Sequence, residues 1–551
     1  MAETGVITDT VKRDQIFWWV LLVIEVFFCV VILADLSNYT VDDGYIYLNG
    51  ARQLARGELP NMTPGEAPTN AWGSYLWLLM LTPAYLLGMN PLFWAKALGF
   101  LFLLGGIWWI SLLFRCWRPQ MTRLESLASA GLLLAFVPAV YGSVNVLETG
   151  FHLFALLTAL YFLVRGVEKK RPGLLFGLSL SLLCVSRPDA FIEVILFLAS
   201  YLWLSFKRES PFIRRDTWRP LLGLVPGLLF WAALAIVYGQ LLPTSAMAKM
   251  PALSFLLSFV WLRNFDLAVV EMAYTPVLIL AIVGAFVFVF RRRKDAPILP
   301  VRFLLGAIIL CGLVKMMVIM DWTMLNRLWV GEAVIAIACS TVLLYDLIDK
   351  LRSRFIAATF FCIGLMGGLW GWRFHVFNYF VKTHCPAREM GELINELKLP
   401  DSWLATPDMG LLPYLADIPA VDTCLSPVGN RHMIEHPGDV DYVWSHKVDF
   451  VVICSIYMNP EEAEDVLYGI PDSLYKSNYF VEHFRPVMVA EGAVPLTLDY
   501  YCENLGHYFH LYVSDRIKYE APDPVPIHLR GLAALPVDYP YLNLIIGDWM
   551  R

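Results

Sequence analysis

Two adjacent carboxylates, Asp42 and Asp43, follow the first apolar segment of this 551-residue chain and precede the sequence GYIYLNGARQLARGELP. That sequence has the apolar spacing of a helix, so both acids would lie at a helix N-terminus, where the dipole and free N–H groups stabilise negative charge. Such a pair suits a general base, or two carboxylates that share a proton or a cation. The alternative is a pair of solvated loop acids, although capping explains one aspartate better than two.

Glu148 is a third acid of interest, in the sequence NVLETGFHLF (145–154) at the end of an apolar run. An ionisable side chain at membrane depth indicates a functional residue by default. The alternative is a carboxylate that merely starts a helix. We expect His152, one turn further on, to be a core histidine, and Glu25 and Lys315 to pack or pair within apolar segments.

Lys249 and Arg327 are cations in segments that are otherwise poor in charge. A phosphate or pyrophosphate group needs such partners, both for binding and for stabilising the charge on a leaving group. Snorkelling at a membrane interface is the alternative. It explains Arg327 less well, because that residue follows Asp321 and Trp322 in a compact polar turn.

Arg187, in the sequence SRPDA (186–190), fits either of two roles. It can contact a phosphate, or it can pair with Asp189. Asp189 in turn is placed to cap the helix that follows.

The elements that hold these residues are predicted from composition. Hydrophobic residues make up 58% of the chain and charged residues 16%, with a mean hydropathy of +0.58. Soluble domains are nearer half apolar and a quarter charged, so much of this surface should face lipid. A net charge of -6 gives no sign of nucleic-acid binding. We therefore predict a polytopic α-helical membrane protein whose partner is the lipid bilayer.

Eleven segments have the length and apolar character of spanning helices. The apolar segment 71–88 is rich in Trp, Tyr, Pro and Gly, and we interpret it as an interfacial or re-entrant helix, with a true span as the alternative. The predicted spans are 15–35, 91–114, 124–142, 148–165, 172–187, 188–206, 220–240, 268–290, 302–320, 328–346 and 355–376.

The distribution of Lys and Arg orients these spans. If 71–88 does not span, the basic loops, including RRRK at 291–294, all fall on the cytoplasmic side with the N-terminus. Every polar segment described above then falls on the opposite face. The sequence thus predicts a multi-pass protein of the cell (inner) membrane whose reactive groups gather at the outer leaflet.

The chain changes character from about residue 385 to residue 551, where no run reaches spanning length. We predict an extracytoplasmic α/β domain there, periplasmic or extracellular, with a helix at 388–398 and strands at 403–406, 449–455, 482–490 and 507–513. The boundary divides the chain into a membrane module (1–384) and this domain (385–551). Its cysteines could form disulfides or stay as free thiols: Cys385, Cys424, Cys454 and Cys502.

Several of these segments resemble, in order, the motifs of GT-C superfamily glycosyltransferases, most closely the mycobacterial-type terminal arabinofuranosyltransferases and their bacterial relatives. DDGYIYLNGARQLARGELPNMTPGEAPTNAW resembles their first outer loop, and NVLETGFHLFALL resembles a "GLETALFALL" segment. SRPDAF, YGQLLPTSAMAK, DWTMLNRLWV and PDMGLLPYLADIPAVDTCLSP resemble further motifs. The chain departs from the pattern at Arg56-Gly57-Glu58, at Pro243-Thr244 and at Ile319-Met320, which bears on the sugar more than on the reaction.

The resemblance implies transfer of a sugar, arabinofuranose among the candidates, from a polyprenyl-phosphate donor to an envelope glycan or exported glycoprotein, with inversion at the anomeric carbon. Asp42 or Asp43 would deprotonate the acceptor hydroxyl, and Glu148 would support that base or a bound cation. The family includes metal-dependent and metal-independent members, so no cofactor is predicted, although a divalent cation near these three acids stays open. The implied substrate-binding residues are Arg52, Arg187, Lys249, Asp321, Trp322 and Arg327.

Two other classes of function compete with a transferase. A transporter or flippase for lipid-linked sugars would line a path through the bilayer with ionisable residues, whereas this sequence collects them at one face. An envelope-assembly scaffold would use the C-terminal domain to bind polymers and would need no base.

Overall fold

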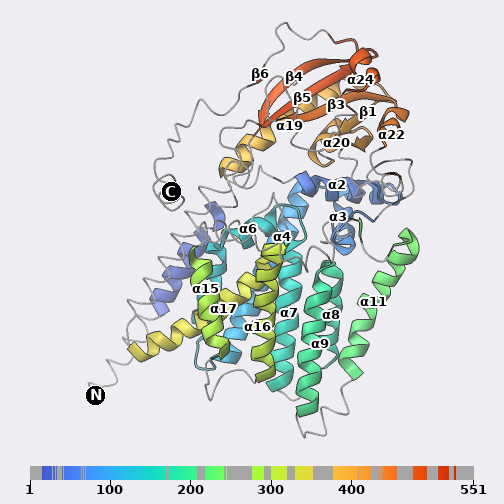
Figure 1. Ribbon diagram of the computed structural model, residues 1–551. Helices are drawn as coiled ribbons and strands as arrows, with labels where there is room; N and C mark the ends of the chain where they lie inside the picture. Colours follow the sequence, from blue (N-terminus) through green and yellow to red (C-terminus); the bar gives the residue numbers. More distant parts are fainter. Residues whose placement is uncertain are drawn as a thin grey trace, which may run out of the picture.

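The computed structural model describes residues 15–33, 40–168, 173–207, 218–240, 243–244, 276–290, 299–318, 329–351, 377–423, 432–455, 474–492, 507–519 and 527–528. Short gaps fall at 28, 32, 34–39, 41, 62, 64, 66–67, 69, 408, 433–435, 437–438 and 475. Figure 1 shows two layers, a helical bundle and a mixed sheet with short helices, and α2 (Asp42–Ala55) lies between them.

The bundle is built from long apolar helices that follow the predicted segments closely. Large side chains face outward on them: Phe93, Phe290 and Ile236 are 68%, 72% and 84% exposed. Apolar side chains exposed on this scale indicate a lipid-facing surface. The bundle helices are α4 (Pro91–Trp117), α7 (Thr149–Glu168), α8 (Leu174–Ser186), α9 (Ala190–Lys207), α11 (Trp218–Tyr238), α15 (Pro276–Phe290), α16 (Leu299–Val318) and α17 (Val330–Leu351).

Within the described part of the chain, α4, α7 and α11 are long and apolar enough to cross a membrane, and one bent pair of helices adds a fourth candidate span. A helix also covers Gln15–Val31, whereas the predicted span 355–376 lies outside the described residues. The total of eleven spans therefore stays a prediction.

The predicted span 124–142 corresponds to the bent pair of helices. The chain forms α5 (Arg123–Gly131), a 3₁₀ turn η1 (Leu132–Ala135) and α6 (Val137–Val144), with a bend of 75°. Pro138 lies in the first turn of α6 and has no N–H to donate to a carbonyl of the preceding turn. It therefore favours the start of a new helix over the continuation of α5. An apolar run alone does not reveal such a break.

The apolar segment 71–88 contains α3 (Tyr75–Leu86), a helix of 12 residues. Ser74 caps it, with the Trp77 N–H donating to Ser74 Oγ at 3.3 Å. A helix of this length rises only about 18 Å, short of the roughly 30 Å hydrocarbon core. Its length accords with the interfacial interpretation, and Figure 1 places it beside α2.

Close helix packing in the bundle depends on small residues. At the crossing of α8 and α11, a side chain on Gly177 or Gly223 would overlap the backbone of the other helix. Ser181 Oγ donates to the Gly223 carbonyl at 2.7 Å and accepts from the Gly227 N–H at 2.9 Å. Small residues and hydroxyl hydrogen bonds of this kind are how helices associate within lipid.

The C-terminal sheet has six strands in the order β2-β1-β3-β5-β4-β6. β1 pairs in parallel with β2 and β3, and the β3–β5–β4 ladder is antiparallel. Four observed strands lie close to the predicted ones: β1 (Trp403–Thr406), β3 (Val448–Ser455), β4 (Phe484–Gly492) and β5 (His507–Ser514). The short strands β2 (Ala420–Asp422) and β6 (Ile527–His528) were not predicted.

Short helices connect and flank these strands: α20 (Leu411–Ala416), α22 (Val440–Ser445) and α24 (Asn478–His483). The longer α19 (Phe377–Leu397) runs across the predicted boundary at residue 385. The exact division into two domains stays a prediction. The side chains of the four cysteines proposed for disulfides lie outside the described residues.

Candidate active site at the junction of the two layers

Asp42 bridges the two layers. Its carboxylate accepts the Gly410 N–H at 3.1 Å and the Leu411 N–H at 2.6 Å, which are the first free donors of α20. These residues are 368 and 369 positions away in sequence. Gly410 lies directly against the Asp42 backbone, with no room for a side chain. Asp42 therefore acts as a cap for a helix in the other layer.

Asp43 and Gly44 place the start of α2 against the segment that carries Glu148. A Cβ on Gly44 would lie 2.8 Å from the Asn145 carbonyl oxygen and 3.0 Å from the Val146 Cβ. Gly44 thus allows a close approach that no other residue permits. Asp43 itself is partly exposed, unlike Glu148, which is 4% exposed.

The segment before Glu148 has a strained backbone. Val146 adopts φ 75°, a left-handed conformation that costs a β-branched residue on the order of 1–3 kcal/mol. Neighbouring contacts hold it: Trp77 Nε1 donates to the Val146 carbonyl at 2.8 Å, and Asn145 Oδ1 accepts the Leu147 N–H at 3.2 Å. The packing thereby fixes the direction in which Glu148 leaves the backbone.

Glu148 faces Arg187 across a distance of 4.0 Å between Glu148 Oε1 and Arg187 Nε. Its Oε2 is buried and has no hydrogen-bond partner among the described residues. Arg187 is itself held by Asp189, with Nε–Oδ1 and Nη2–Oδ2 distances of 2.9 and 3.1 Å. The fork of Arg187 is thus occupied by protein carboxylates here, and its predicted contact with a substrate phosphate stays a prediction.

A second charged cluster lies next to this one, centred on Lys315. Its ammonium group lies 2.8 Å from Asp189 Oδ2, 2.8 Å from Glu193 Oε1 and 2.7 Å from Glu332 Oε1. His152 is buried beside it and contacts Ser186 Oγ at 2.9 Å. Lys315 is therefore a charge-pair residue, in agreement with the sequence.

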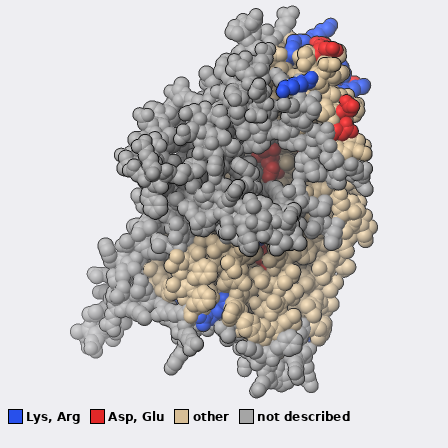
Figure 2. Space-filling view, in the orientation of Figure 1, with Lys and Arg blue, Asp and Glu red and all other residues tan. Residues whose placement is uncertain are grey.

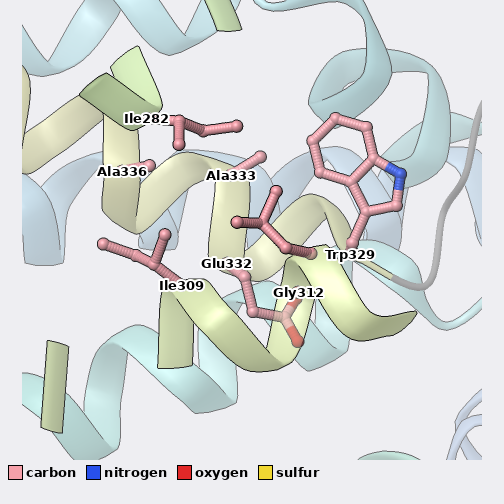
Figure 3. A pocket seen from close by; sticks show the side chains of 8 residues that line it. Ile282, Ile309, Gly312, Trp329, Glu332, Ala333 and Ala336 are labelled. Atoms are coloured by element: carbon pink, nitrogen blue, oxygen red, sulfur yellow. The ribbon is translucent and has the colours of Figure 1, made fainter. Parts of the chain in front are cut away.

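The sequence analysis missed Glu193 and Glu332 in this cluster. Both stand in the first turn of an apolar helix, and an acid at that position within the membrane is the signal that could have identified them. Figure 3 shows Glu332 passing Gly312 at the edge of a small space of about 10 Å³, lined also by Ile282, Ile309 and Trp329. That space is no larger than a water molecule requires.

Four described acids, Glu148, Asp189, Glu193 and Glu332, therefore gather at one end of the bundle, the end that faces the sheet. α7, α9 and α17 begin there, and α8 and α16 end there. Figure 2 shows acidic side chains recessed in a hollow between the two layers, whereas most of the described surface over the bundle carries no charge. The polar chemistry of the membrane module is concentrated at this junction.

Arg52 lies at the opposite end of α2 from the acids. It forms an ion pair of 2.7 Å with Asp417 and lies over the Tyr414 ring. Ten residues separate it from Asp42, about 15 Å along the helix. The structure therefore places Arg52 in a different part of the junction from Arg187 and Glu148.

The other predicted substrate-binding residues lie outside the described residues: Lys249, Asp321, Trp322 and Arg327. The segment just before Lys249 is anchored, since the Thr244 N–H donates to the Asn70 carbonyl at 2.8 Å. Thr244 itself thereby lies beside the loop that follows α2.

A divalent cation near Asp42, Asp43 and Glu148 stays a prediction, since each Asp42 oxygen that accepts an N–H group retains a second lone pair. Both oxygens of the Asp42 carboxylate accept backbone N–H groups. Within the described ranges, no three His, Cys, Asp or Glu side chains come together in a way that could hold a metal ion. We derive no chemical step through a metal.

No protein-family profile matches the sequence, and no curated protein matches it in sequence. In structure, the chain is similar to the archaeal oligosaccharyltransferase AglB from Archaeoglobus fulgidus, solved in complex with an inhibitory peptide and a dolichol-phosphate. The TM-score is 0.54 at 12% identity, over 89% of this chain and 81% of that chain. The apo form of an Archaeoglobus fulgidus oligosaccharyltransferase gives a TM-score of 0.50 at 12% identity, over 88% and 81%.

ArnT from Cupriavidus metallidurans, bound to undecaprenyl phosphate, has a TM-score of 0.41 at 16% identity, over 73% of this chain and 85% of that chain. That value is too low to carry an argument. The similarity to AglB, at 12% identity, shows the fold alone. The chain therefore has the fold of a helical membrane protein similar to AglB.

Proposed function

We propose that this protein is a membrane glycosyltransferase that moves a sugar from a polyprenyl-phosphate carrier to an acceptor hydroxyl or amide. The observation that carries the proposal is the fold shared with AglB over 89% of the chain. The acids at the junction supply the chemistry that the fold requires: a partly exposed Asp43 beside a buried Glu148.

Asp43 is the proposed general base. Both oxygens of its neighbour Asp42 accept N–H groups of α20. We therefore assign proton transfer to Asp43 and the positioning of α2 against α20 to Asp42. In the proposed step, the acceptor oxygen attacks the anomeric carbon, and its proton passes to Asp43. The bond between that carbon and the phosphate oxygen breaks, and the polyprenyl phosphate leaves as an anion. One base suffices because this leaving group needs no protonation.

Glu148 is proposed to support this step through its charge. It lies 4.0 Å from Arg187, and the packed, strained Val146 two residues earlier sets the direction of its side chain. A preorganised carboxylate near a developing positive charge on the sugar ring stabilises the transition state. Lys249 and Arg327 are proposed to hold the donor phosphate, and Arg187 to hold Glu148.

Several finer features belong to the same proposal. The sugar is proposed to be a pentose or hexose, arabinofuranose among them, and the acceptor an envelope glycan. A direct attack by the acceptor would invert the anomeric configuration. The reaction is proposed to occur at the outer leaflet, with the C-terminal sheet on that side, because the basic loops identify the cytoplasmic face.

The test is a donor panel with the purified full-length protein in nanodiscs. Polyprenyl-phosphate pentoses and hexoses are incubated with envelope oligosaccharides, and products are identified by mass spectrometry. We expect one donor to yield a product larger by one sugar, together with released polyprenyl phosphate, and Glu148→Gln to abolish both. Movement of intact lipid-linked sugar between leaflets, without release of the phosphate, would instead identify a flippase.

A further inference from the structure

A second polar site lies along α2, away from the reacting acids. A cleft of about 300 Å³ opens between the C-terminal half of α2, the loop after it, and the chain around α20. About half of its lining is polar, and the polar part combines Asn49, Arg52, Arg56 and Glu58 with Asp417. Apolar residues, Trp72 and Met409 among them, form the rest. Cavities of this size, with a few convergent polar groups, are typical of small-molecule sites.

The walls of the cleft are held rigidly. Arg52 Nη2 donates to Asn49 Oδ1 at 2.8 Å, while its Nη1 lies 2.7 Å from Asp417 Oδ1. The Gln53 amide both donates to the Asn61 carbonyl at 2.9 Å and accepts the Asn61 N–H at 2.7 Å, which braces the loop. A site whose polar groups are already fixed loses little entropy when a ligand binds.

The cleft is bridged at both ends by the same pair of helices. Asp42 at the start of α2 binds the start of α20, and Arg52 near the end of α2 binds Asp417 just after α20. Between these contacts, the rings of Tyr45 and Tyr414 lie 5.2 Å apart. This α2–α20 clasp, defined by Asp42, Tyr45, Arg52, Gly410, Tyr414 and Asp417, connects the reacting end of α2 to the cleft.

The chemistry of the lining selects a neutral, polyhydroxylated ligand. Two arginines are balanced by Glu58 and Asp417, so the cleft offers no net charge to attract a phosphate. The amide, guanidinium and carboxylate groups of the lining include both hydrogen-bond donors and acceptors. A sugar hydroxyl, which both donates and accepts, can bind to either kind. A glycan fits this pattern better than an anionic lipid headgroup does.

We propose that this cleft binds a remote part of a glycan acceptor, several rings from the hydroxyl that reacts at Asp43. The inference rests on the proposed function, since it assigns the acceptor of that reaction. The separation of about 15 Å along α2 means that only acceptors long enough to reach the cleft gain from it. Binding energy from such a remote subsite gives preference for a chain over a short sugar.

The test measures binding without a donor, so its outcome does not depend on turnover. Neutral pentose and hexose oligosaccharides, from disaccharides to hexasaccharides, are titrated into the full-length protein in nanodiscs. We expect affinity to rise with chain length, and Arg56→Ala to weaken the longest oligosaccharide about tenfold. Arg388→Ala is the matched control, because Arg388 is 59% exposed on α19 and pairs with Glu392 outside the cleft.

Three results would overturn the proposal: no dependence on chain length in the wild type, equal weakening by Arg56→Ala and Arg388→Ala, or tight binding of peptides in place of oligosaccharides. Glu58→Gln is a second variant, at another exposed lining residue, and should also weaken the longest oligosaccharide. If oligosaccharides bind as expected while no donor is turned over, the proposed reaction fails and the glycan site stands.

Discussion

Two groups of buried charge lie side by side in this protein, and they are satisfied to different degrees. Around Lys315, one ammonium group lies within 2.8 Å of three carboxylates. At Glu148, one carboxylate oxygen lies 4.0 Å from Arg187. The other oxygen, like Glu193 Oε2 and Glu332 Oε2 in the Lys315 cluster, has no hydrogen-bond partner among the described residues, so the two groups differ in the distance between opposite charges. Burying charge is costly unless it is paired.

We interpret this difference as one between a charge cluster that stabilises the fold, around Lys315, and a carboxylate kept for catalysis, Glu148. The Lys315 cluster joins α9, α16 and α17, and its pairing is what holds those helices in register. Glu148 lies farther from its cation than the acids around Lys315 do, and it follows a strained valine, which is typical of a site where stability is given up for function. Four substitutions with different expected effects on stability test this distinction.

Lys315→Met should destabilise the bundle most. It leaves three carboxylates facing one another without their common partner, and breaking a buried ion pair in this way costs about 3–5 kcal/mol. Thermal unfolding in nanodiscs, followed by tryptophan fluorescence, measures the loss. The double variant Lys315→Met/Glu332→Gln should recover part of it, and a double variant no more stable than the single one would count against the cluster as described.

Asp42→Asn should have an intermediate effect. The amide retains an oxygen acceptor but loses the charge that favours the helix N-terminus, so we expect a cost of about 1 kcal/mol. Gly410→Ala should cost more than this, because the added methyl group meets the Asp42 backbone. Limited proteolysis of α20 would detect the loosened clasp; unchanged protection in both variants would contradict the capping role.

Glu148→Gln should leave stability nearly unchanged, within about 1 kcal/mol, because the wild-type carboxylate is only loosely paired. Its unfolding temperature should therefore stay close to that of the wild type while activity is lost. A destabilisation as large as that of Lys315→Met would show that Glu148 is a structural charge like the others.

Asp401→Asn should have the smallest effect on stability, and that effect should depend on pH. Hydrogen bonds from Lys447 and Arg516 lower the pKa of the exposed Asp401 carboxyl. Its contribution to stability is therefore present above the ordinary aspartate pKa of about 4 and is lost as the pH falls through the lower folded-state value. We expect wild type and variant to differ by about 1 °C or less at neutral pH, and to converge in acid.

Local sequence patterns predicted the elements well. Strand β1 coincides with the predicted residues 403–406, and α2 begins at the acidic pair. Alternating or helical spacing and turn residues decide such features within a few positions. The break near Pro138 shows where an apolar run conceals a bend.

Long-range contacts could not be predicted in the same way. Nothing near Asp42 indicates that its carboxylate binds α20, 368 residues further on. The partners of Lys315 come from two other segments of the chain, the start of α9 and the start of α17, and only the rotation of each packed helix decides which acids face it. The sequence therefore predicted candidate site residues, and the structure adds that the Asp42 carboxylate accepts backbone N–H groups of α20.

The most direct test of the account is the single-turnover rate of polyprenyl-phosphate release by Asp43→Asn, compared with Asp42→Asn and the wild type. We predict that Asp43→Asn loses roughly 10²–10⁴-fold in this rate while it keeps wild-type donor affinity and unfolding temperature. Asp42→Asn should lose less and should be less stable. Wild-type release by Asp43→Asn would contradict the account.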